Sequence, residues 1–130
     1  MCNQLLNRSS RFGVIVGAIV LAGASHALAE ASCRPTLAFK HVAFSPMQPP
    51  TMQRTWTAVV AVDASRCAAD SRGHFEIVFT RLQEFGPDSE SSEEFTWAAP
   101  EVTVSVDFAP SEAVERYRID VVAPCPCAAK

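Results

Sequence analysis

Four of the five cysteines offer the clearest chemistry in this sequence; the fifth, Cys2, lies in the N-terminal segment that we expect to be removed as a signal peptide. Cys33 and Cys67 are far apart in the chain, whereas Cys125 and Cys127 form a Cys-Pro-Cys segment near its C-terminus. An even number of cysteines in a small domain of an oxidising compartment is typical of a disulfide framework. We therefore expect two disulfides that join the tail cysteines to Cys33 and Cys67, in either of the two pairings. A bridge between Cys125 and Cys127 is disfavoured because it would close a small, strained ring.

A second interpretation treats some of these residues as a metal or redox site. The thiolates of Cys125 and Cys127 would suit Cu(I) or zinc, and a disulfide between them would be easily reduced. His41, Met47 and Met52 are further candidates for copper ligands. We expect no metal and no cofactor, because exported thiolates oxidise unless the metal arrives first. Methionines in a proline-rich loop, moreover, usually serve packing.

No combination of residues predicts catalysis. Beyond the N-terminal apolar run the only glycines are Gly73 and Gly86, and neither opens a phosphate-binding loop; a nucleophile elbow is also absent. The acids of residues 86–94 match no calcium-binding loop. Paired carboxylates such as Glu93 and Glu94 lie in a stretch too polar to be held rigidly for acid–base work. We expect a protein that is not an enzyme.

The first 29 residues have the pattern of a secretory signal peptide. Arg8 and Arg11 precede an apolar run at residues 12–24, and Ala27-Leu28-Ala29 provides a cleavage site. The run is shorter than the roughly 20 residues that a membrane-spanning helix needs, so we expect no stable membrane anchor after cleavage. The sequence thus predicts a signal-peptide helix within 1–29 and one disulfide-bonded domain at 30–130, located in the periplasm or secreted.

Apolar and polar residues alternate through most of the remaining chain, which is the pattern of half-buried β-strands. The alternation changes phase near Lys40 and His41, where we expect a bulge. Six strands are predicted, at residues 37–44, 56–63, 75–80, 95–97, 102–108 and 117–122.

The segments between these strands have the composition of loops. Residues 45–50 are rich in proline, and residues 64–73 are polar. Residues 86–94 are acidic and rich in serine, so we expect a mobile loop there. Residues 110–115 begin with Pro110 and Ser111, which favours a single helical turn with Ser111 as its N-cap.

Trp56 and the run Tyr117-Arg118-Ile119-Asp120-Val121-Val122-Ala123 resemble two strands of the immunoglobulin and fibronectin type III superfamily. The resemblance implies a small antiparallel all-β sandwich of two sheets and about six strands, in which Tyr117 ties down a corner. Only residues 124–130 follow this run, which leaves little room for the superfamily's last strand.

The expected sandwich predicts which residues are buried and where the cysteines lie. Thr103, Ser105 and Arg118 should be exposed. In an antiparallel arrangement with the superfamily's topology, all four cysteines should meet at one pole. The residues expected to be buried are Trp56, Val60, Phe75, Ile77, Val104, Val106, Tyr117 and Ile119.

Charge and composition favour a binding or structural role. Removal of Arg8 and Arg11 with the signal peptide changes the formal net charge from −3 to −5, which disfavours nucleic-acid binding. We expect an exported, non-catalytic module that binds an unidentified protein in the cell envelope or outside the cell. The alternatives are a metal-binding or thiol-redox accessory protein that uses the Cys-Pro-Cys end, and a small secreted protease inhibitor that presents its loops.

Overall fold

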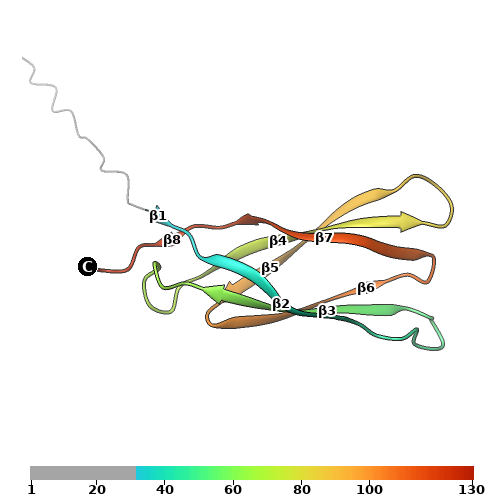
Figure 1. Ribbon diagram of the computed structural model, residues 1–130, viewed down its shortest axis with the longest axis horizontal. Helices are drawn as coiled ribbons and strands as arrows, with labels where there is room; N and C mark the ends of the chain where they lie inside the picture. Colours follow the sequence, from blue (N-terminus) through green and yellow to red (C-terminus); the bar gives the residue numbers. More distant parts are fainter. Residues whose placement is uncertain (1–31) are drawn as a thin grey trace, which may run out of the picture.

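The computed structural model describes residues 32–130, and the predicted signal peptide lies outside the described residues. The described chain is built from antiparallel strands (Figure 1). No helix that could cross a membrane lies within this part of the chain. The strands are β1 (Ser32–Cys33), β2 (Thr36–Phe44), β3 (Arg54–Asp63), β4 (Arg72–Gln83), β5 (Ser89–Ala98), β6 (Glu101–Phe108), β7 (Glu112–Val122) and β8 (Cys125–Pro126).

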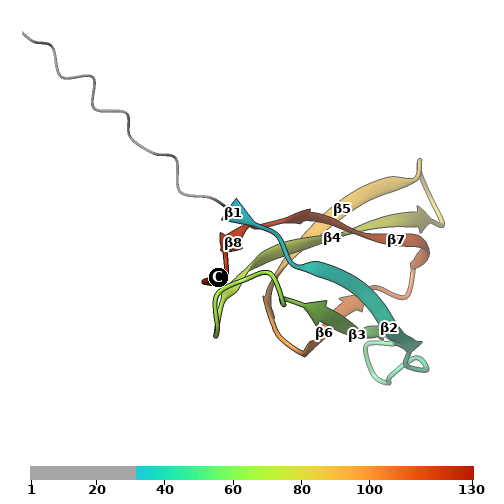
Figure 2. The same cartoon turned by 60° about the vertical axis from the view of Figure 1, so that its left-hand side comes forward.

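Six long strands form two facing sheets. One sheet has the order β2-β3-β6 and the other has the order β5-β4-β7. The two-residue strands β1 and β8 pair with each other at one end of the molecule (Figure 2). The predicted small two-sheet antiparallel β-sandwich is therefore confirmed.

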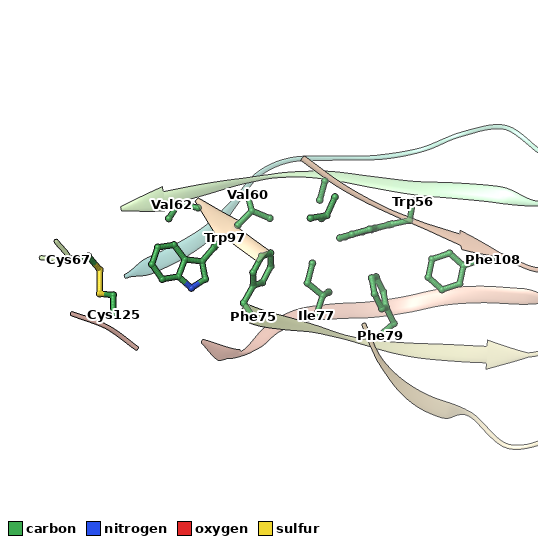
Figure 3. Packing of buried hydrophobic residues seen from close by; sticks show 12 residues of the cluster. Trp56, Val60, Val62, Cys67, Phe75, Ile77, Phe79, Trp97, Phe108 and Cys125 are labelled. Atoms are coloured by element: carbon green, nitrogen blue, oxygen red, sulfur yellow. A yellow bond between two sulfur atoms is a disulfide. The ribbon is translucent and has the colours of Figure 1, made fainter. Parts of the chain in front are cut away.

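The core lies between the sheets and follows from the alternation in β3 and β4. Every second residue of β3 from Trp56 to Val62 is buried, and Phe75, Ile77 and Phe79 of β4 face them (Figure 3). The ring of Trp56 lies edge-on to Phe79, with ring centroids 4.8 Å apart. Edge-to-face aromatic contacts add to the stabilisation that burial itself provides.

Trp97 fills the core at the end nearer the cysteines, and a glycine makes room for it. Gly73 of β4 lies directly opposite Trp97 of β5 in the ladder. A Cβ atom at Gly73 would lie 2.8 Å from the indole nitrogen of Trp97, closer than real Cβ atoms approach. Residue 73 therefore has to be glycine if the fully buried indole is to keep this place.

The predicted bulge in the first long strand is confirmed. The register between β2 and β3 shifts between Phe39 and His41, so Lys40 is the extra residue. The shift lets Phe39 and Val42 face the core although they have opposite phases in the sequence. It accounts for the change of phase without a change of sheet.

Two of the predicted connections are wrong. Residues 89–94, expected to form a mobile loop, belong to β5 and pair with β4 from Glu94 opposite Glu76 to Ser89 opposite Arg81. An edge strand needs few apolar side chains, because its outward face meets solvent. Residues 110–115, expected to form a helical turn, make a tight turn that leads into β7 at Glu112.

The predicted core is correct in its centre and wrong at one margin. Thr103, Ser105 and Arg118 are exposed, as expected. Tyr117 is 37% exposed rather than buried, and Val106 and Ile119 are only partly buried. Tyr117 belongs to β7, whose outer edge has no neighbouring strand in the described chain, so one side of its ring meets solvent.

We expect Phe75→Ala to lower the free energy of unfolding by about 3–5 kcal/mol, because the fully buried ring leaves a cavity. Phe85→Ala is the control, since its ring is 84% exposed and its loss should change stability by about 0.5 kcal/mol or less. Chemical denaturation of both variants measures the difference. Equal stability of the two would show that the core is not where we place it.

Candidate functional site

All four cysteines described by the structure meet at one pole of the sandwich, which we call the cysteine pole. Cys33 is bonded to Cys127 and Cys67 is bonded to Cys125. The Cα atoms of the two pairs are 5.0 Å and 5.6 Å apart, within the usual range for disulfides. This is one of the two pairings that the sequence left open.

The disulfides attach the C-terminal tail to the sandwich together with backbone hydrogen bonds. Ser32 and Cys33 of β1 pair with β8. The N–H of Ala68 donates to the carbonyl of Pro126 (2.8 Å), and the N–H of Ala128 donates to the carbonyl of Arg66 (2.9 Å). The tail thus contacts both the strand that enters the domain and the loop that follows β3.

The two disulfides differ in their surroundings. Cys67 and Cys125 are 5% and 3% exposed and belong to the same cluster as Trp97 (Figure 3). Cys33 only packs against that cluster and is partly exposed. The buried bridge extends the hydrophobic core, whereas the other bridge lies at its margin.

The loop at this pole begins with a capped turn. The N–H of Ser65 donates to Oδ1 of Asp63 (3.0 Å). This backbone hydrogen bond, together with one from the Ser65 side chain, lowers the pKa of the Asp63 carboxyl below its ordinary value. A carboxylate that caps its own turn serves structure rather than proton transfer.

The structure separates the other candidate metal ligands from the Cys-Pro-Cys segment. His41 is on β2, and Met47 and Met52 are in the hairpin between β2 and β3, at the end of the sandwich opposite the cysteine pole (Figure 1). Residues 32–130 contain no group of three or more histidine, cysteine or acidic side chains placed to hold a metal ion. The four sulfur atoms are bonded in two pairs, so none offers a thiolate while the disulfides are intact.

A charged cluster at the end opposite the cysteine pole was not predicted from the sequence. Arg81 of β4 points between the sheets and is 15% exposed. Its guanidinium donates to Oε2 of Glu112 (2.9 Å), and its Nε donates to Oγ of Ser91 (2.6 Å). It also lies 3.4 Å from Glu93 and 4.5 Å from the centre of the Phe108 ring.

The Arg81 cluster has the chemistry of a structural clamp. Strands β4, β5 and β7 contribute its charged and polar groups, and β6 contributes the ring. A guanidinium shared by two carboxylates and an aromatic face has most of its donors occupied. The signal available in the sequence was the inward phase of Arg81, which continues the series Phe75, Ile77, Phe79.

The outer face of the β5-β4-β7 sheet carries an open hollow of 580 Å³, which we call the β7 hollow. Val78, only 8% exposed, lies at its base. Arg118 donates to Oε1 of Glu90 across it (3.2 Å). Its remaining lining residues are Thr80, Glu115, Arg116 and Tyr117.

Tyr117 connects the β7 hollow to the core. Its ring centroid is 5.1 Å from that of Phe39 and 5.3 Å from that of Trp56. The hollow therefore lies on a strand whose inner side is packed against aromatic rings of the opposite sheet.

Comparisons of the chain with protein-family models, with curated proteins and with solved structures found no match.

We expect Cys67→Ala/Cys125→Ala to lower the free energy of unfolding by about 3–5 kcal/mol, because both chain constraint and core packing are lost. Cys33→Ala/Cys127→Ala should cost less, about 2–3 kcal/mol, because Cys33 lies at the margin of the core. Chemical denaturation of the two double variants tests this order. A larger loss from the second pair would contradict it.

We expect Arg81→Leu to lower the free energy of unfolding by about 2 kcal/mol, because Glu93 and Glu112 would lose their partner at a partly buried site. Lys40→Ala is the matched control. Its ion pair with Glu101 has the same 2.9 Å length as the Arg81–Glu112 pair but is exposed, so its loss should change stability by about 0.5 kcal/mol or less. Similar effects from both would show that the cluster is not a clamp.

Proposed function

We propose that this protein is an exported, non-catalytic binding module with an immunoglobulin-like fold, and that it recognises a protein partner through the β7 hollow. The proposal has three parts, which are export, fold and binding surface. Each has its own support.

Export is supported by the two disulfides and by the sequence of the N-terminal segment. The two disulfides indicate an oxidising environment, such as the periplasm or the outside of the cell. The signal-peptide pattern of residues 1–29 supplies the route. We expect the exported protein to begin at Glu30.

The immunoglobulin-like assignment is supported by strand order. The sheet β2-β3-β6 corresponds to strands A, B and E of that fold, and β4 and β7 correspond to strands C and F. The position of β5 beside β4 matches the additional strand that variable-type domains place there. The superfamily's last strand has no counterpart in either sheet, and the two-residue β8 pairs with β1 instead.

The β7 hollow is the observation that carries the binding role. Arginine is a side chain that protein interfaces favour, and here the side chains of Arg116 and Arg118 line one depression with Val78 at its apolar base, while the Tyr117 ring between them points to the core. Both arginines come from one strand of a packed sheet, so little backbone entropy is lost when a partner binds.

The shape and charge of the hollow favour a protein over a small molecule. It is open to solvent and lies on a sheet face, whereas small-molecule sites bury most of their ligand. Its rim carries both signs, with Glu90 and Glu115 beside the two arginines. A protruding side chain of a protein partner, flanked by charged groups of both signs, fits this arrangement.

We expect Arg116→Glu/Arg118→Glu to weaken partner binding by about tenfold or more, since interface arginines are frequent hot spots. The exported protein and the variant are compared in capture of envelope and extracellular proteins from the source cells, followed by affinity measurement with the captured partner. Lys40→Glu/Arg54→Glu makes the same charge change on β2 and β3 and should bind like the unaltered protein. Equal binding by all three proteins would place recognition elsewhere.

A further inference from the structure

Residues 32–130 form two sheets with four outer edges, and three of these edges carry features that obstruct strand addition. The edge strand β2 is interrupted by the bulge at Lys40. The edge strand β7 has extra residues at Glu115 and Val121, and Val121 has a positive φ of 40°. Bulges of this kind twist an edge away from a flat incoming strand.

The third obstructed edge is protected by charge. Strand β5 carries Glu90, Glu93 and Glu94, and Glu93 points inward to the Arg81 cluster. Acidic and inward-pointing charged side chains are devices that keep an edge from pairing with another chain.

The fourth edge, β6, has no bulge, and its charged residues, Glu101 and Asp107, lie near its two ends. All eight of its residues pair with β3 without a shift in register. Its central residues Val102-Thr103-Val104-Ser105-Val106 are uncharged and have high strand propensity. Strands β5 and β6 leave their shared turn in diverging directions, so β5 does not cover this edge (Figures 1 and 2).

The hydrogen-bond pattern identifies which backbone groups β6 presents outward. The N–H of Val62 donates to the carbonyl of Pro100 (2.8 Å), one step beyond the Ala61–Glu101 pair, so this step is a hydrogen-bonded position of the ladder. Such positions alternate along an antiparallel ladder, so Val102, Val104 and Val106 bond to β3. The N–H and carbonyl groups of Glu101, Thr103, Ser105 and Asp107 therefore face away from β3.

We propose that β6 is a homodimerisation edge. Two copies of this chain pair their β6 strands antiparallel with Ser105 on the two-fold axis. The result is a continuous sheet in the order β2-β3-β6-β6-β3-β2. Two-fold pairing of one strand with itself is the isologous interface that closed dimers use.

The sequence of β6 selects a second copy and this register. With Ser105 opposite Ser105 of the partner subunit, Thr103 lies opposite Asp107 and Val104 lies opposite Val106. Each pair then joins side chains of compatible chemistry on one face. The neighbouring register, centred on Val104, would place Glu101 opposite Asp107, and directly opposed like charges are destabilising.

Cysteine crosslinking tests the register. The Cα atoms of a hydrogen-bonded antiparallel pair are about 5.5 Å apart, which suits a disulfide. We expect Ser105→Cys to give a reducible covalent dimer on non-reducing gels of the exported protein. Thr103→Cys should not, because its counterpart would lie roughly 13 Å along the strand. Crosslinking by Thr103→Cys that equals or exceeds that of Ser105→Cys would overturn the register.

Light scattering during size-exclusion chromatography tests the dimer without an added cysteine. We expect the unaltered protein to form a dimer and Ser105→Lys to weaken dimerisation by about tenfold or more, since two lysines would be directly opposed. Thr96→Lys adds the same charge at an exposed position of the edge strand β5 and should leave the dimer unchanged. Circular dichroism checks that both variants fold. A monomer at every concentration, or a dimer insensitive to Ser105→Lys, would overturn the proposal.

Discussion

The bond between Cys67 and Cys125 is the constraint on which the rest of this small sandwich depends. It joins the loop after β3 to the segment after β7, and these two strands belong to opposite sheets. Because both sulfur atoms are buried beside Trp97, the bond also closes the core at that end. A domain of about 100 residues buries only a modest core, so a covalent link between the two sheets adds substantially to its stability.

The other end of the sandwich is held by charge. Arg81 reaches from the centre of one sheet to groups on β5 and β7 and to a ring on β6. The two ends respond to different conditions, because a reductant breaks the sulfur bonds and high salt weakens the exposed part of an ion-pair cluster. Between these two ends, the alternation of apolar and polar residues along the strands is enough to form the core.

The sequence was sufficient for the features that depend on local pattern. Alternation located β3, β4 and β6 and the phase change at Lys40, and strand direction brought the four cysteines to one pole. It was insufficient where a neighbour decides the conformation. Residues 89–94 are strand because β4 offers a free edge and Arg81 offers a partner to Ser91 and Glu93. The β7 hollow likewise depends on which side chains adjacent strands place together, as Arg118 and Glu90 show.

The pairing of β1 with β8 has a mechanical consequence. The chain enters the domain at Cys33 and the tail leaves it at Cys127, and a sulfur–sulfur bond joins these residues. Tension applied between the segments that precede Cys33 and follow Cys127 would pass through that bond. Neither sheet would then carry the load. A pulling force applied at these two points would leave the domain folded and would not lengthen it.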